Sequence, residues 1–192
     1  MMNFLGHIYF SNNDKKLMLD NLFGDFVKGK DLSFYPKNVQ KGLLLHRKID
    51  DFIDHHPKVL ELTHKLYIDL PKVSAIAIDL FFDHLLAKNW STFHETELNV
   101  FLAEFYTSIN LNENYYSNDF KLMISKMIEI NWISYYPTLE GLEKACQGVS
   151  KRLSFENKLK FGKEVFLKFE KEIEPVFSEY MSDAKIKFNI QH

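Results

Sequence analysis

Four pairs of polar side chains stand four residues apart, each inside a stretch that is otherwise apolar. This spacing puts both members of a pair on one face of a helix, where they can point into the same pocket. The pairs are Asn3 with His7, Asn21 with Asp25, His46 with Asp50, and Asp79 with Asp83, which is followed directly by His84. Because their neighbours are apolar, we expect these polar groups to be buried and to converge on one site.

The mixture of carboxylates and imidazoles indicates a divalent metal ion. Burying several carboxylates together is costly unless cations compensate their charge. Imidazole nitrogen with carboxylate oxygen, and no thiolate, is typical of Mn²⁺, Fe²⁺, Mg²⁺ or Zn²⁺ sites that leave one position open to water. Solvated surface charge is the alternative, because a chain with 26 acids and eight histidines also forms such pairs by chance.

Other histidines and aspartates lack this setting and are not predicted to belong to the site. The histidines that we expect at the surface are His55, His56, His64 and His94. Asp51 and Asp54 fall on other faces of the helix than His46, so they are left out of the candidate ligands.

The composition indicates one all-α domain, a helical bundle that spans residues 1–192. Apolar residues make up 46% of the chain and recur at helical spacing, while seven glycines and five prolines are few for this length. The formal net charge of −2 offers no positive field for a nucleic-acid backbone, so we expect no nucleic-acid partner. The single cysteine, Cys146, rules out an intramolecular disulfide.

The N-terminal stretch MMNFLGHIYFSNND has no basic leader and only a broken apolar run, so it does not resemble a secretory signal. The apolar run VSAIAIDLFFDHLL contains Asp79, Asp83 and His84, and it is too short and too polar to cross a bilayer. We therefore expect a soluble, cytoplasmic protein with no membrane partner.

Helix start and stop signals divide the chain into helices of ordinary length. The Asn/Asp cluster at residues 12–14 predicts an N-cap for a helix that ends near Gly29, and Pro36 and Pro57 enclose the next helix. Further helices are predicted over residues 72–89, 95–109, 119–134, 138–151 and 154–182, the last with Ser154 as its N-cap and a bend at Pro175.

Four motifs lie in the first half of the chain, spread over residues 2–90: MNFLGHIYF, DNLFGDFVKG, HRKIDDFIDHHP and DLFFDHLLAKNW. In order, spacing and residue types they resemble the motifs of the acyl carrier protein phosphodiesterases. GLEKACQGVSKRL, at residues 141–153, is similar to a later stretch of small residues and arginine. The family is an unusual relative of the HD phosphohydrolases, which are helical metal enzymes. The resemblance therefore implies an HD-domain-like fold, although the order here is reversed, as Asp83-His84.

The resemblance implies a hydrolase for the phosphodiester that joins 4′-phosphopantetheine to a serine of holo acyl carrier protein, with the apo protein as product. It implies Mn²⁺ as the metal, with Mg²⁺ or Fe²⁺ as alternatives. Acyl carrier proteins are acidic, so the protein partner would meet a basic rim around the site, and opposite charge would steer the encounter.

Each candidate residue then has a predicted role. The predicted metal ligands are Asp25, His46, Asp50, Asp79, Asp83 and His84. Catalysis is assigned to His7 as general acid or base, to Asn21, and to Arg47, whose planar fork suits a phosphodiester. The predicted substrate-binding residues are Asn3, Lys48, Lys88 and Arg152. The family tends to have arginine where this chain has Lys48 and Lys88, and lysine cannot grip phosphate bidentately.

Two other functions remain open. An HD-type phosphohydrolase acting on nucleotides or other small phosphoesters would keep the metal ligands and change only the rim of the site. A helical interaction module without enzymatic activity would use the polar pairs as buried ion networks, and His7 would then be a satisfied core histidine. The module predicts no bound metal and no loss of stability with a chelator.

Overall fold

The computed structural model describes residues 4–191, which form helices and connecting turns with no β-strand. The α-helices are α1 (Phe4–Tyr9), α2 (Lys15–Leu22), α3 (Lys37–His55), α4 (Pro57–Leu66), α5 (Ser74–Lys88), α6 (Trp90–Phe93), α7 (Leu98–Ser108), α8 (Asn118–Ile130), α9 (Leu139–Arg152) and α10 (Gly162–Lys187). The short 3₁₀ helices are η1 (Phe23–Phe26), η2 (Trp132–Tyr135) and η3 (Leu159–Phe161). The predicted all-α fold class is confirmed.

Proline sets the boundary between α3 and α4. Pro36 stands directly before α3, and Pro57 occupies the first position of α4, where its missing N–H needs no partner. His56, between the two helices, is extended, because a proline ring disfavours helix in the residue before it. The sequence predicted the end of α3 at this proline but not the helix that begins there.

Short polar side chains cap other helices close to their predicted starts. In each case the side-chain oxygen accepts a hydrogen bond from the backbone N–H three residues further on. The capping residues are Asp14 for α2, Ser117 for α8 and Thr138 for α9. Such caps are local signals, which is why the sequence alone places these starts well.

The predicted start of the last helix is wrong. Ser154 caps no helix, because the chain after α9 forms a loop in which the Asn157 side chain donates to the carbonyls of Ser150 and Phe155. Helix α10 therefore begins only at Gly162, and it continues to Lys187, past the predicted end.

Helix α2 also differs from its prediction, and the difference shapes the site. It ends at Leu22 and passes into the tighter turn η1 instead of continuing towards Gly29. Asn21 and Asp25 consequently do not share one face of a continuous α-helix. The tighter turn gives the Asp25 side chain a direction of its own.

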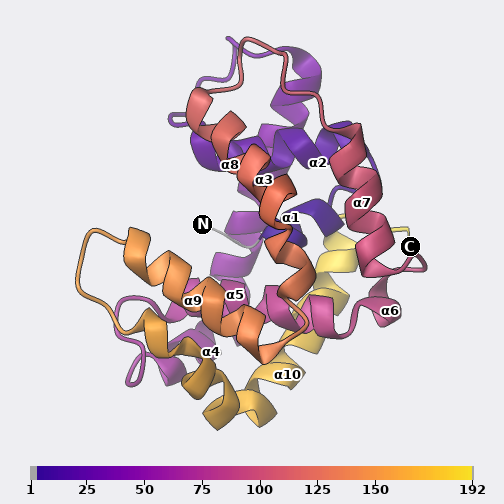
Figure 1. Cartoon of the computed structure of the whole chain (residues 1–192). Helices are drawn as coiled ribbons and strands as arrows, with labels where there is room; N and C mark the ends of the chain where they lie inside the picture. Colours follow the sequence, from indigo (N-terminus) through magenta and orange to yellow (C-terminus); the bar gives the residue numbers. More distant parts are fainter. Residues whose placement is uncertain (1–3, 192) are drawn as a thin grey trace.

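The helices pack around one continuous core that is rich in aromatic side chains. Helix α1 lies in the middle of the molecule, and all of its residues are buried (Figure 1). It packs against α2 and α5, and α2 in turn packs along α3, so the helices that carry the four N-terminal motifs meet. Among residues 4–191, no helix combines the length and apolar character needed to cross a membrane.

Two histidines predicted at the surface are buried, so that prediction is wrong for them. His56 is 4% exposed, because α10 covers the turn before α4 and Asp183 lies 3.2 Å from its Nε2. His94 is 8% exposed, because its ring packs against aromatic side chains of α6 and α7. His55 and His64 are exposed, as predicted.

Candidate metal centre

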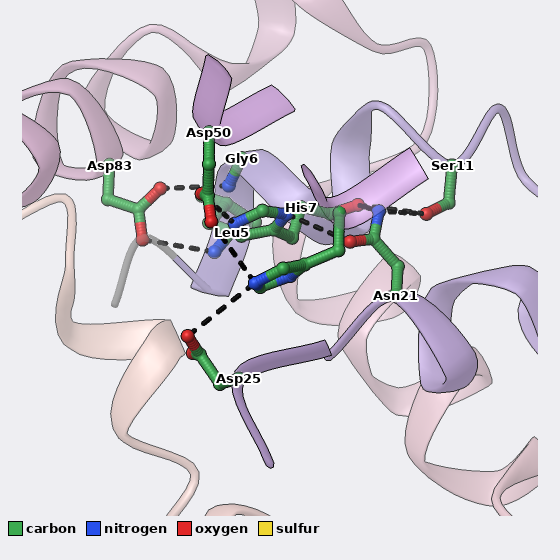
Figure 2. Close-up of polar contacts among 9 residues, drawn as sticks. Leu5, Gly6, His7, Ser11, Asn21, Asp25, Asp50 and Asp83 are labelled. Atoms are coloured by element: carbon green, nitrogen blue, oxygen red, sulfur yellow. Dashed lines mark hydrogen bonds and ion pairs between the residues drawn. The ribbon is translucent and has the colours of Figure 1, made fainter. Parts of the chain in front are cut away.

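Side chains from α1 and α3 converge in the interior (Figure 2). His7 of α1, and His46 and Asp50 of α3, offer nitrogen and oxygen atoms that all lie within 4.8 Å of one another. The Asp50 carboxylate oxygens stand 3.3 Å from Nε2 of His7 and 3.2 Å from Nε2 of His46. The two imidazole rings stack with their centroids 4.2 Å apart. We call these three residues the central group.

Asn21 of α2 fixes the orientation and the tautomer of the His7 ring. Its Nδ2 donates to the His7 carbonyl at 2.9 Å and to Oγ of Ser11 at 3.0 Å. Its Oδ1 is therefore left to accept from Nδ1–H of His7 at 2.8 Å. With the proton on Nδ1, the free Nε2 faces Asp50. Asn21 is completely buried, so it positions His7 instead of contacting a substrate.

Asp25, in η1, approaches the central group from the side opposite Asp50 (Figure 2). Its carboxylate lies 3.5 Å from Nε2 of His46, and its side chain is 19% exposed. Gly24 makes this approach possible, because a Cβ at position 24 would overlap the His46 ring. Gly24 was not among the predicted site residues. Its place directly before Asp25 in LFGDF is the signal that could have identified it.

The carboxylates around His46 hold a proton on its ring. Burial lowers the pKa of His46, but Asp25 and Asp50 outweigh burial and raise this pKa to about 9. Burial raises the pKa of Asp50, yet its contact with His46 keeps that pKa well below the usual range. Burial is the main cause that lowers the pKa of His7, and the lower pKa favours the neutral form of its ring. The proton on His46 is thus the positive charge between two carboxylates.

The two aspartates of α5 have different surroundings. Asp83 accepts hydrogen bonds from the backbone N–H groups of Leu5 and Gly6, at 3.0 and 2.8 Å, and so caps the start of α1 (Figure 2). Burial raises the Asp83 pKa to about 7, although the two amides oppose this shift. Asp79 is buried, and burial together with the charge of Asp50 raises its pKa well above the usual value. Asp83 therefore holds the helix that carries His7.

The structure does not bring His84 into the central group. Its Nδ1 forms a hydrogen bond with the Tyr136 carbonyl at 2.7 Å, and its ring packs edge-on against Phe166 of α10. Successive positions on a helix point about 100° apart, so Asp83 and His84 cannot both face α1.

Arg152 is a predicted substrate-binding residue that shares a cavity with the site. It lies at the end of α9 and lines a cavity of about 260 Å³ together with Asp25. Lys88 instead pairs with Glu170 of α10 at 3.1 Å, and Lys48 lines a separate groove against the end of α10. The predicted substrate-binding set is therefore divided among different faces.

Arg47, predicted to act in catalysis, contacts a loop beside the site. Its Nη2 donates to the carbonyl of Gly29 at 2.6 Å, in the segment that follows η1. It thereby ties α3 to the loop after Asp25. The remaining predicted residue, Asn3, lies outside the described residues.

The donor atoms fit a divalent metal ion. Nε2 of His7 and Oδ1 of Asp50 are buried and face each other at 3.3 Å, without a hydrogen bond in the described part of the chain. A neutral nitrogen lone pair and a carboxylate oxygen in this position repel each other unless a cation lies between them. Imidazole nitrogens with carboxylate oxygens from Asp50 and Asp25 suit Mn²⁺, Fe²⁺ or Zn²⁺.

Comparison with known families gives a match over nearly the whole chain. The family model described as acyl carrier protein phosphodiesterase matches residues 2–184. Curated proteins of that name are similar to this chain. The one from Photorhabdus laumondii is 28% identical over 152 residues, which cover 79% of this chain and 77% of the relative. The one from Yersinia pestis is 28% identical over 152 residues, with 79% of each chain covered.

A shorter stretch is more similar. The relative from Salmonella agona is 33% identical over 90 residues, which cover 47% of each chain. No solved structure was found to match, so the predicted relation to the HD phosphohydrolases stays a prediction.

Proposed function

The chain belongs to the acyl carrier protein phosphodiesterase family, and from this premise we propose that it uses a divalent metal ion to remove 4′-phosphopantetheine from holo acyl carrier protein. The proposed dependence on a metal ion rests on one observation, the central group of His7, His46 and Asp50 with Asp25 beside it. A phosphodiester is an anion, and it needs added positive charge at a site that already contains the carboxylates of Asp50 and Asp25.

The metal ion, when bound, would lower the pKa of a water molecule and neutralise charge on the phosphoryl oxygens. Nε2 of His7, Nε2 of His46 and the carboxylates of Asp50 and Asp25 are the atoms that would hold it. This makes His7 a ligand in place of the general acid or base predicted from the sequence. Metal binding would also displace the proton that Asp25 and Asp50 keep on His46.

Other residues prepare these ligands from further away. Asn21 keeps the Nε2 lone pair of His7 free, and Asp83 holds the helix that carries His7. Arg152, in the same cavity as Asp25, is the candidate to bind the phosphodiester, because its planar fork matches two phosphoryl oxygens. Arg47 would act in catalysis only if the loop at Gly29 moved, because its Nη2 is hydrogen-bonded to the Gly29 carbonyl.

The test is mass spectrometry of holo acyl carrier protein incubated with the purified protein and Mn²⁺. We expect the carrier protein to lose its prosthetic group, and the loss to disappear with a chelator, with His46→Ala and with Asp50→Ala. Asp51→Ala is the matched control, because Asp51 lies on the same helix with its side chain 77% exposed. This variant should keep the activity.

Two results would reject the proposed function. Intact holo carrier protein together with hydrolysis of nucleotides or small diesters would favour the alternative phosphohydrolase. No hydrolysis of any phosphoester, with stability unchanged by chelator, would favour the interaction module.

A further inference from the structure

A second, larger cavity adjoins the one that Asp25 and Arg152 line. It lies between α9 and η2 and has a volume of about 460 Å³, within the ~300–1,000 Å³ usual for small-molecule sites. We call it the α9 groove. Phe4 and Arg152 line both cavities, so the α9 groove meets the smaller cavity next to Asp25.

One wall of the α9 groove is aromatic, and the other wall includes residues with small side chains. Trp132 and Tyr135 of η2 form part of the first wall, and Tyr135 is 54% exposed although its ring is large and apolar. Helix α9 forms the second wall with Gly141, Ala145 and Gly148, which recur at helical spacing. The groove is therefore largely apolar, and the small residues of α9 leave space along that helix.

One cationic side chain, Arg152, lies at the end of the groove that meets the cavity beside Asp25. Arg152 makes no ion pair in residues 4–191, and its Nε donates only to the Gly148 carbonyl at 3.3 Å. Lys144, further along the groove, is already paired with Glu140 at 2.7 Å. Arg152 is thus the cation that is available to an anionic ligand at the junction of the two cavities.

We propose that the α9 groove binds the pantetheine arm of the substrate, with the phosphate beside Arg152. The inference rests on the proposed function, because it concerns the same substrate. The 4′-phosphopantetheine group is a flexible, uncharged chain of methylene, dimethyl, hydroxyl and amide groups that ends in a thiol, and it carries its phosphate at the opposite end only. An apolar groove with Arg152 where it meets the cavity beside Asp25 matches that distribution of charge and polarity.

Gly148 offers a way to fill the groove without disturbing the fold. A Cβ placed at Gly148 meets no atom within 4 Å, whereas one at Gly141 would overlap the carbonyl of Tyr135. Leucine at position 148 would therefore project into the groove. Gln147→Leu adds the same side chain to the same helix at a position that does not line the groove, and it serves as the control.

The kinetic test compares holo acyl carrier protein with bis(4-nitrophenyl) phosphate, a diester without a pantetheine arm. Gly148→Leu should raise KM for the carrier protein at least tenfold. It should also lower kcat/KM for the carrier protein at least tenfold more than kcat/KM for the small diester. Gln147→Leu should leave the KM for the carrier protein unchanged. If Gly148→Leu and Gln147→Leu behave alike, the groove proposal is overturned and the proposed function stands.

A binding test covers the case in which the groove binds pantetheine but the proposed function is wrong. Free pantetheine should change the fluorescence of Trp132, Trp132→Phe should lack that change, and Gly148→Leu should weaken the binding at least tenfold. Binding at Trp132 without hydrolysis of holo carrier protein would keep the groove and reject the proposed function. No fluorescence change at saturating pantetheine would overturn the groove.

Discussion

The orientation of single side chains decides whether the central group can hold a metal ion. Asn21→Leu removes the acceptor for Nδ1–H of His7, so the ring can turn or carry its proton on Nε2. We expect Mn²⁺ to bind about 10–100-fold more weakly, the usual effect of losing such a partner. Isothermal titration calorimetry measures this, with Asn99→Leu on the exposed face of α7 as control. Equal affinities in the two variants would contradict the positioning role of Asn21.

Gly24 is the second residue on which the site depends. Gly24→Ala should push the His46 ring away from Asp25 and lower the free energy of unfolding by ~1–3 kcal/mol, the usual cost of overpacking. Gly148→Ala is the matched variant, since its new Cβ meets no neighbour, and it should stabilise the protein by about 0.5–1 kcal/mol. Urea denaturation measures both. Wild-type stability in Gly24→Ala would show that the close approach to His46 is not required.

Spacing predicted these residues unevenly. His46 and Asp50 share a helix face, as the four-residue spacing predicted, because α3 is regular at that point. Asp25 reaches the same place by another route, through the tighter turn η1. Asp83 and His84 are adjacent, so only the position of α1 beside one of them tells which residue lies near the site. The position of α1 is set by tertiary packing, and no local sequence pattern predicts it.

Helix α1 shows how one element depends on another. It has six residues, too few for a stable helix by itself, and its first amides are held by Asp83. Asp83→Ala should leave two buried N–H groups without an acceptor, at about 1–3 kcal/mol each in the free energy of unfolding. We expect this loss in urea denaturation even when a chelator has removed the metal ion.

The metal dependence of that loss separates two roles for Asp83. A residue that caps α1 stabilises the protein with or without the ion, whereas a residue that acts only as a metal ligand stabilises it only when the ion is present. Asp83→Asn keeps one acceptor oxygen and should recover part of the stability that Asp83→Ala loses. A loss confined to the Mn²⁺-loaded protein would contradict the capping role and restore Asp83 to the predicted ligands.

The range of the contacts that hold a helix explains which helices the sequence could predict. Caps such as Ser117 and proline boundaries such as Pro57 act within a few residues, and they mark real helix ends. The spacing of Asn3 and His7 pointed to a helix face here, but the side chain that holds α1 lies 77 and 78 positions further along the chain, and no local pattern predicts that contact. The predicted cap at Ser154 was wrong because the Asn157 side chain instead ties the residues after α9 into a loop, through hydrogen bonds to the carbonyls of Ser150 and Phe155.

At the scale of the whole molecule, the fold class was predictable because it sums many weak signals over the chain. Apolar residues at helical spacing and few glycines point to helices throughout, and the helices of residues 4–191, without a strand among them, confirm the all-α class. The α9 groove was not predictable, since its walls come from Phe4, η2 and α9, which are far apart in the sequence. Its shape depends on packing between elements, whereas helical periodicity depends on each element alone.

Cys146 can report whether α9 opens by itself or only when the whole molecule unfolds. Its thiol is buried against α10, and burial raises its pKa to about 12, so at neutral pH reactive thiolate is scarce and inaccessible. We expect Ellman's reagent to label the native protein only through global unfolding. The labelling rate should then rise with urea as steeply as global unfolding does. Labelling that is independent of urea would contradict this and would mean that the α9 wall of the groove opens locally.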